Sequence, residues 1–205
     1  MLEVSVTGLS ELEKCERCFW YRTKRIYAPK IFPTILTALD GLQKRDTALR
    51  TQKGQDIRWL HEGTPLPGIT KRMKATYNGI TLKGEIDELV KVSSGYKVID
   101  YKSSASPYEL DKANHYYQTQ LSAYAFLCEQ NGFSPVVDAE LVFYCPYFLE
   151  DKNAVFEIFR VPLTVNIPKV KMLLSRASEV MQMPSPPLGS SCDWCRYCED
   201  RMRYR

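Results

Sequence analysis

Two acidic residues and one lysine, Asp87, Asp100 and Lys102, have types and spacing that could support chemistry on a phosphate. They fall in two short runs rich in Val, Ile and Tyr that are separated by a Ser/Gly segment, a pattern that predicts an antiparallel β-hairpin. If Ser94-Gly95 forms the two-residue turn, Asp87 lies opposite Lys102. Because side chains alternate between the faces of a strand, Asp100 and Glu85 would share that face.

Two carboxylates on one face of a hairpin repel each other unless a cation lies between them. Oxygen ligands of this kind suit Mg²⁺ or Mn²⁺ better than zinc. A metal ion there can activate water and stabilise charge on a phosphate, and a neighbouring lysine can position an anionic substrate. The structural alternative is a solvated cross-strand salt bridge between Asp87 and Lys102.

The order of these motifs resembles a known family. Gly84-x-x-Asp87, a turn, Asp100-x-Lys102 and a helical segment carrying Gln120 and Tyr124 are similar to the PD-(D/E)XK nuclease superfamily. More narrowly they resemble its RecB-type branch, which includes the nuclease domains of bacterial recombination helicases and the small CRISPR-associated iron–sulfur exonucleases. The resemblance covers nearly all of the chain and implies an α/β fold, with a restriction-endonuclease-like mixed central sheet flanked by helices.

The resemblance also implies roles for residues of the hairpin. Asp87, Asp100 and the main-chain carbonyl of Tyr101 would hold Mg²⁺ or Mn²⁺, and Lys102 would orient or deprotonate the attacking water. Glu85, on the same face, would be an outer ligand. The activity implied is metal-dependent hydrolysis of DNA phosphodiester bonds.

Two further segments belong to this expected site. Gln120 and Tyr124 are spaced i, i+4, so both project from one helix face, and in the family this pair borders the active site and touches substrate or the catalytic lysine. Family members commonly carry Gly-x-x-x-His, whose imidazole is a metal ligand, but Arg58 stands at that spacing from Gly54. Either His61, one helical turn later, is the ligand in a shifted register, or Arg58 contacts phosphate and His61 is a surface residue.

Basic and polar residues around the motifs are candidate DNA contacts. Lys71, Arg72 and Lys74 form a basic strand ahead of an Asn78-Gly79 hairpin turn; such a strand could hold phosphates, or it could be an edge strand protected by lysine. The full set of candidates is Arg58, Lys71, Arg72, Lys74, His115 and Gln118.

Five of the seven cysteines lie near the two ends of the chain. An odd total without an evident secretion signal argues against a disulfide framework and favours metal or cofactor ligation. In the RecB-type branch one N-terminal cysteine joins three C-terminal ones around a [4Fe–4S] cluster, which implies Cys15, Cys192, Cys195 and Cys198. The spacing also allows a tetrahedral zinc site from Cys15-x-x-Cys18 and Cys192-x-x-Cys195, with Cys198 spare. Unligated thiols are a third reading.

Composition and periodicity bound the architecture. The 205 residues, 44% hydrophobic and 25% charged, fit one domain, residues 1–205, in which residues 1–22 and 184–205 would form a cysteine-ligated cap. The expected helices are a short one capped near Ser10, helices after a loop in 27–54, one at 108–130 containing Cys128 and one at 165–183. The expected strands are at 71–77, 136–148 (containing Cys145) and 154–162. An extended connector at 184–187 and a cysteine loop at 192–198 follow the last helix. Cys128 and Cys145 are expected to be buried thiols.

The mild net charge of +4 suggests a polyanionic partner only weakly. No apolar run approaches the roughly 18 residues of a membrane span, so we expect a cytoplasmic protein. The expected function is a DNA nuclease, an exonuclease on single-stranded ends, working with CRISPR adaptation or recombination proteins. The alternative is a catalytically silent DNA-binding or adaptor module that keeps the fold and a structural metal site.

Overall fold

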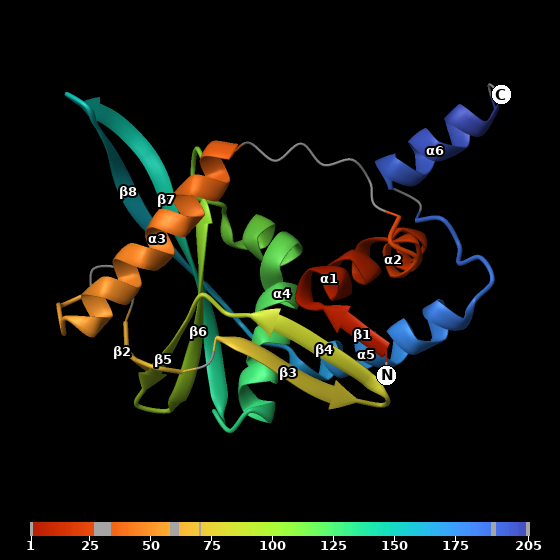
Figure 1. Cartoon of the computed structure of the whole chain (residues 1–205), viewed down its shortest axis with the longest axis horizontal. Helices are drawn as coiled ribbons and strands as arrows, with labels where there is room; N and C mark the ends of the chain where they lie inside the picture. The colour runs from red at the N-terminus through yellow and green to blue at the C-terminus, as the bar shows by residue number, and fades with distance from the viewer. Residues whose placement is uncertain (1, 27–33, 58–61, 70, 190–191, 204–205) are drawn as a thin grey trace.

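The computed structural model of the chain (Figure 1) describes residues 2–26, 34–57, 62–69, 71–189 and 192–203, and leaves out the side chains of residues 198, 199 and 201–203. Within these ranges no helix combines the length and the hydrophobicity that crossing a membrane would require. Arg58 and His61 lie outside the described residues.

A five-stranded mixed sheet forms the centre of the molecule. Its order is β2-β5-β6-β7-β8, and β6 and β7 run parallel while the other neighbours are antiparallel. Parallel neighbours need a crossover, and helix α4 supplies it. The strands are β2 (Thr64–Pro65), β5 (Glu88–Val92), β6 (Gly95–Ser103), β7 (Val136–Glu150) and β8 (Asn153–Leu163), and the crossover helix is α4 (Leu110–Gln130).

A smaller second sheet lies beside the first. Strand β4 (Ile80–Glu85) pairs antiparallel with β3 (Arg72–Tyr77) and parallel with β1 (Leu2–Ser5). The predicted Asn78-Gly79 turn is confirmed, because Tyr77 pairs with Ile80 and both turn residues have positive φ, 47° and 78°.

The predicted hairpin from residue 84 to 102 is wrong in its first arm. Strand β4 ends at Glu85 and pairs with β3, and β5 begins only at Glu88. Strands β5 and β6 place Val92 opposite Gly95, so the turn is Ser93-Ser94, one residue earlier than expected, and the partner of each paired residue shifts by two. Two residues are one full period of side-chain alternation, so the face on which Asp100 and Lys102 lie is unchanged. Glu85 is removed from that face; it is exposed and pairs with Arg72 at 2.8 Å.

Helices cover both faces of the five-stranded sheet (Figure 1). Helix α3 (Thr34–Gln52) crosses one face over a small apolar cluster, Ile57, Val90, Ile99, Tyr101 and Val142. Helix α4 packs on the other face in the main core, with α5 (Ile167–Gln182) against it. The buried thiols of Cys128 in α4 and Cys145 in β7 confirm the expectation for both.

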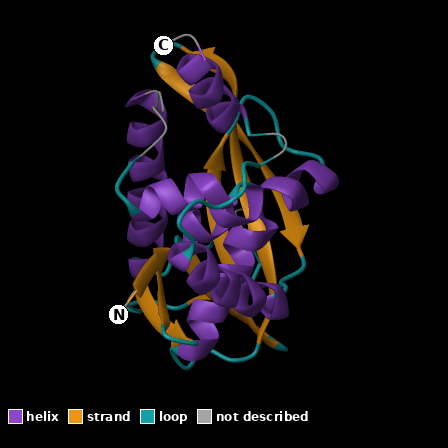
Figure 2. Ribbon diagram, turned by 90° about the vertical axis from the view of Figure 1, so that its right-hand side faces the viewer, coloured by secondary structure: helices purple, strands orange, loops and turns teal. Residues whose placement is uncertain are grey.

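The N-terminal segment, residues 6–23, and the C-terminal segment, residues 193–203, lie on the same side of the molecule and contact each other, although the labelled N- and C-termini themselves are well separated (Figures 1 and 2). Helix α1 (Val6–Lys14) begins after Ser5, whose Oγ accepts from the Gly8 amide at 3.0 Å, and not near Ser10 as expected. Ser10 lies within the helix because β1 already ends at Ser5. Helix α2 (Glu16–Thr23) follows, and α6 (Asp193–Arg203) replaces the expected cysteine loop.

The segment between α5 and α6 is held by the N-terminal helices. Arg17 Nε donates to the Pro186 carbonyl at 2.7 Å, and Trp20 Nε1 donates to the Met183 carbonyl at 3.0 Å. These bonds bring the start of α6 against α2.

Candidate active site and cysteine centre

Asp87 lies at a bend between β4 and β5 and is 7% exposed. Its Oδ2 accepts a hydrogen bond from the Tyr101 amide at 2.9 Å. Pairing of β5 with β6 ends at Glu88, so the Asp87 carboxylate satisfies a main-chain donor that the departing strand leaves behind. This bond fixes the carboxylate beside β6.

The other oxygen of Asp87 faces helix α3. Lys44 Nζ lies 2.9 Å from Asp87 Oδ1 and 3.2 Å from Asp40 Oδ2. Burial lowers the pKa of Lys44, but the Asp87 carboxylate outweighs burial and the pKa rises above its ordinary value. Lys71 contacts the Asp87 carbonyl and lies 3.4 Å from Glu88 Oε2. Asp87 is therefore bounded by two cations, neither of which is Lys102.

Asp100 and Lys102 lie on the α4 side of β6. Asp100 is 2% exposed, and Lys102 Nζ is in ion-pair contact with its Oδ2. Burial raises the pKa of Asp100 to about 6; the Lys102 ammonium opposes this shift and the Asp87 carboxylate adds to it. Asp87 Oδ2 accepts from the amide of Tyr101, the residue directly after Asp100, so the two carboxylates belong to one small charged site. In place of the structural alternative, a salt bridge between Asp87 and Lys102, the structure has the ion pairs Asp87–Lys44 and Asp100–Lys102.

Helix α4 contributes the expected pair from its second half. Gln120 Nε2 donates to Asp100 Oδ1 at 3.4 Å and lies 3.3 Å from the Tyr124 hydroxyl. Gly84 lets β4 approach this helix, because a Cβ there would lie 3.0 Å from Tyr124 Cε1 and 2.8 Å from Val6 Cγ2. The glycine of the Gly-x-x-Asp motif thus supports the position of Tyr124.

The donor set fits a divalent cation. Among the described residues, Asp100 Oδ2 is a buried oxygen without a hydrogen-bond partner of acceptable geometry, although Lys102 contacts it. Two buried carboxylates with an oxygen in this state suit a hard cation such as Mg²⁺ or Mn²⁺. Tyr101 can contribute only through its main chain, since its side chain packs on the α3 side of the sheet.

Two of the candidate DNA contacts, Arg72 and Lys74, form ion pairs on the second sheet, and a third, Lys71, lies near Asp87. Arg72 pairs with Glu85 at 2.8 Å, and Lys74 pairs with Glu3 at 2.9 Å on the exposed second sheet. This is the arrangement of a strand protected by charge. Lys71 lies against Asp87, as described above. His115 and Gln118 lie on α4, on the N-terminal side of Gln120.

Sequence reasoning missed Lys44, Asp40 and Glu88. Asp40 and Lys44 are visible in the sequence as an i, i+4 pair of a helix. Their contact with Asp87 depends on how α3 crosses the sheet, which no local pattern records. Glu88 directly follows Asp87, is buried, and has a pKa that burial raises.

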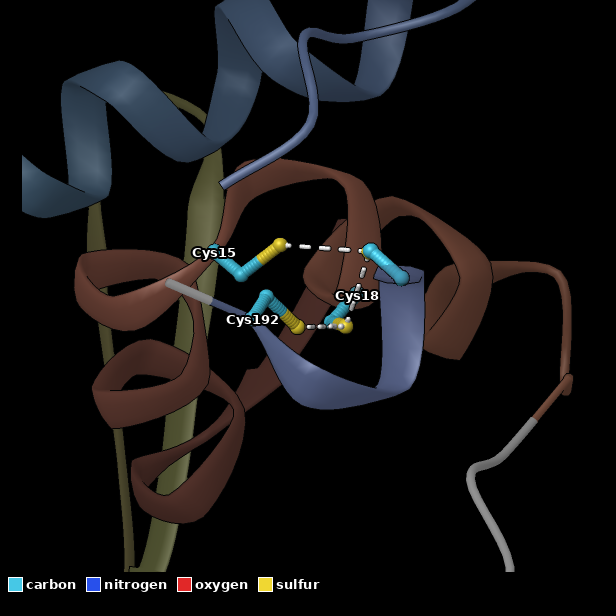
Figure 3. Close-up of side chains that lie close together, drawn as sticks. Cys15, Cys18 and Cys192 are labelled. Atoms are coloured by element: carbon cyan, nitrogen blue, oxygen red, sulfur yellow. Dashed lines mark hydrogen bonds between the residues drawn. The ribbon is translucent and has the colours of Figure 1, made fainter. Parts of the chain in front are cut away.

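Four cysteines from the two ends of the chain form a second centre (Figure 3). Cys15 joins α1 to α2, Cys18 lies in α2, Cys192 precedes α6 and Cys195 lies in its first turn. The sulfur separations are 3.2 Å for Cys18–Cys192, 3.5 Å for Cys18–Cys195 and 3.6 Å for Cys15–Cys195, and all four atoms lie within 4.8 Å of one another. The Cys198 side chain lies outside the described residues. The four thiols could bind a metal ion.

The surroundings of the four sulfurs are consistent with a metal site. Burial raises the pKa of Cys195 to about 12 and raises that of Cys18, so ionised thiolates need a compensating cation. For Cys15, burial is outweighed by main-chain hydrogen bonds from Cys18 and Gly189, and the pKa is lowered. Gly189 packs closely against this centre, because a Cβ there would lie 3.0 Å from Cys15 Sγ.

Comparison with known proteins identifies the fold. A family model of the PD-(D/E)XK nuclease superfamily matches residues 33–203. The crystal structure of SSO0001 superposes with a TM-score of 0.53 at 16% identity, covering 98% of this chain and 85% of that chain. A crystal structure of a "Putative exonuclease" from Eubacterium rectale superposes with a TM-score of 0.56 at 14% identity, covering 94% and 86%. At these identities the structural similarity concerns the fold. No curated protein sequence matches the chain significantly.

Proposed function

This chain belongs to the PD-(D/E)XK nuclease superfamily, and from that premise we propose that it is a metal-dependent deoxyribonuclease acting as an exonuclease. The observation that carries the proposal is the convergence of Asp87, Asp100, Lys102 and Gln120 on one small buried site. Retention of every charged group of the motif favours hydrolysis over a silent DNA-binding module. The biological pathway, CRISPR adaptation or recombinational repair, stays a prediction.

The residues have distinct parts in this proposal. Asp87 and Asp100, with the Tyr101 carbonyl, would hold Mg²⁺ or Mn²⁺. Bound there, the ion would activate water and stabilise charge on the phosphate. Lys102 would position the attacking water and the scissile phosphate, and Gln120 would keep the Asp100 carboxylate oriented through the bond to Oδ1. Lys44 would leave Asp87 Oδ1 and become available to a substrate phosphate.

We propose a separate, structural role for the cysteine centre, with one zinc ion held by Cys15, Cys18, Cys192 and Cys195. The support is the compactness of the four sulfurs, all within 4.8 Å. Zn–S bonds of about 2.3 Å give tetrahedron edges of about 3.8 Å. An iron–sulfur cubane bonds each thiolate to a different iron atom and so requires wider spacing. The [4Fe–4S] cluster implied by the resemblance needs Cys198 in place of Cys18.

Colour and metal content separate the two cofactors. Protein purified without oxygen should be colourless and contain about one equivalent of zinc, as expected for a d¹⁰ ion. Cys18→Ser should lose the metal and Cys198→Ser should keep it. A brown protein containing iron, bleached by Cys198→Ser and not by Cys18→Ser, would establish the iron–sulfur cluster instead.

The hydrolytic proposal is tested by Asp100→Asn, which removes a charged ligand and keeps the side-chain shape. Cleavage of end-labelled single- and double-stranded DNA with Mg²⁺ or Mn²⁺ should fall by at least two orders of magnitude, in line with the loss of a metal site essential to the reaction. DNA binding, measured without divalent ions, should remain. Wild-type cleavage by the variant would refute the assignment of Asp100.

Lys102→Ala separates the role of the lysine from that of the ligands. Its loss should reduce the single-turnover cleavage rate while Mn²⁺ binding persists, because Lys102 would act on water and phosphate. An equal loss of Mn²⁺ affinity and of rate would make Lys102 a structural partner of Asp100 only.

A further inference from the structure

Three tyrosines gather beside the candidate active site. Tyr108 precedes α4, and Tyr116 and Tyr117 lie in its first half, ahead of Gln120. Their ring centroids lie 6.0 Å apart for Tyr108–Tyr116, 5.9 Å for Tyr108–Tyr117 and 6.4 Å for Tyr116–Tyr117. We refer to Tyr108, Tyr116 and Tyr117 as the tyrosine platform.

Each ring of the tyrosine platform has a lysine ammonium above it. Lys112 Nζ lies 4.1 Å from the centroid of Tyr108, and Lys14 Nζ lies 5.2 Å from that of Tyr116. Lys102 Nζ lies 5.1 Å from the centroid of Tyr117 and also contacts Asp100. One of the three lysines, Lys102, therefore belongs to the candidate active site, and the other two, Lys14 and Lys112, lie outside it.

A groove lies between α1 and α4 beside two of the platform rings, Tyr116 and Tyr117. It has a volume of about 240 Å³, and its walls include Lys14, Tyr116, Tyr117 and Gln120. Gln120 also donates to Asp100, so the groove opens beside the carboxylates. One carboxylate, Glu11, lines the groove, but it is in ion-pair contact with Arg22.

Packing accounts for two of the three rings. Tyr108 and Tyr117 are partly buried against the main core, as aromatic residues near a helix commonly are. Tyr116 is 44% exposed, although its ring is large and apolar. An exposed aromatic ring next to lysines offers a stacking surface for a base and a charge for a phosphate, the combination that single-stranded nucleic acid binds.

We infer that the tyrosine platform and its groove bind single-stranded nucleic acid by base stacking and lead the strand to Lys102. Tyr116 stacks on a base, and Lys14 and Lys112 contact phosphates. In a duplex each base already stacks on its neighbours and its face is covered, so the platform selects single strands. This inference rests on the proposed nuclease function for the direction in which the strand is led, but binding is measurable without cleavage.

The test uses the whole chain with the metal of the cysteine centre retained, and a fluorescent oligo(dT). The buffer contains no added divalent cations, so the Asp87–Asp100 site is not loaded. Tyr116→Ala should weaken binding about tenfold, within the range for loss of one stacked base. Tyr116→Phe, which keeps the ring, should bind as the wild type does. Tyr147→Ala removes a tyrosine that is 66% exposed on β7, away from the groove, and serves as the matched control with unchanged affinity.

Two further readouts identify stacking and phosphate contact. The fluorescence of 2-aminopurine in the oligonucleotide should be quenched by the wild type and by Tyr116→Phe but less by Tyr116→Ala. Lys14→Met should lower the slope of log affinity against log salt by about 0.7, the value for one phosphate contact of a single strand.

The outcomes separate this inference from the nuclease proposal. Wild-type affinity in Tyr116→Ala, equal weakening in Tyr116→Phe, or equal binding of duplex would overturn the platform while leaving hydrolysis untouched. If the wild type binds oligo(dT) through Tyr116 but cleaves no DNA with Mg²⁺ or Mn²⁺, the platform stands and the nuclease proposal fails.

Discussion

Asp87 and Asp100 are held by different parts of the protein. Asp87 is bonded to the Tyr101 amide and to Lys44 of α3, whereas Asp100 contacts Lys102 and Gln120. Each carboxylate therefore has a counter-cation within the protein. Binding of a divalent cation must compete with Lys44 for the Oδ1 atom of Asp87.

Lys44→Met tests this competition. Removing the ammonium frees Asp87 Oδ1, so the variant should bind Mn²⁺ several-fold more tightly, measured as loss of the free-Mn²⁺ signal in electron paramagnetic resonance. Arg45→Met, on the exposed side of the same helix, is the control and should match the wild type. Equal Mn²⁺ affinity in both variants would show that Lys44 does not compete for the ligand.

At this scale the sequence was informative about motif residues and silent about their partners. Asp87, Asp100, Lys102, Gln120 and Tyr124 were expected together, and the structure places them together. Their roles stay predictions. Lys44 could not be predicted, because its contact with Asp87 depends on the packing of two elements far apart in the sequence.

Among the elements, β4 and α3 matter most to the site. The hairpin pattern correctly predicted the face of Asp100 because the register error was two residues, one full period. It failed for Glu85, because the Asn78-Gly79 turn commits β4 to pairing with β3. The alternation of apolar and polar residues shows that a segment forms a strand, but it does not show with which of two sheets that strand pairs.

Gly84 is predicted to be required for the close approach of β4 to α1 and α4. In Gly84→Ala the new Cβ would lie 2.8 Å from Val6 and 3.0 Å from Leu127 and Tyr124, so we expect a loss of about 1–3 kcal/mol in the free energy of unfolding from overpacking. Denaturant titration measures it.

Gly41→Ala is the matched control for that change. Gly41 lies in α3, and a Cβ there would meet nothing within 4 Å. Alanine is a better helix former, so this variant should gain up to about 1 kcal/mol. Equal effects of the two substitutions would remove the steric role assigned to Gly84.

Helix α3 is predicted to be less stable locally than α4. Its buried residues are the polar Gln43 and Thr47, whereas α4 buries a long apolar face. Gln43 Oε1 is buried without a hydrogen-bond partner among the described residues. Amide hydrogens of α3 should therefore exchange at least tenfold faster than those in the middle of α4, measured by hydrogen exchange and mass spectrometry. Equal protection would contradict this.

For the whole molecule, the cysteine centre is the link between the two ends. The resemblance correctly led us to expect that N- and C-terminal cysteines would meet. It implied Cys198 as the fourth ligand, whereas the described residues bring in Cys18. The spacing allowed both ligand sets. The described residues bring together Cys15, Cys18, Cys192 and Cys195, the set of the zinc alternative, and the identity of the metal stays a prediction.

Removing the metal with a chelator should release α6 and the segment before it. The metal would link Cys15 and Cys195, which are 180 positions apart. Closing a loop of that length stabilises a chain by roughly 5 kcal/mol on the chain-entropy model, so the melting temperature should fall and limited proteolysis should cut within residues 184–189. Strands β5 to β8 should stay protected. Unchanged melting after complete metal loss would contradict a structural role for the centre.

The central claim is that Asp87 and Asp100 form a metal-dependent hydrolytic site. The most direct measurement is single-turnover cleavage of an end-labelled single-stranded oligonucleotide as Mn²⁺ is titrated into protein that retains its cysteine-bound metal. We predict a rate that rises with Mn²⁺ to a plateau in the wild type and a rate at least a hundredfold lower for Asp100→Asn at every Mn²⁺ concentration. Cleavage that is independent of Mn²⁺, or wild-type protein that cleaves nothing across the titration, would contradict the claim.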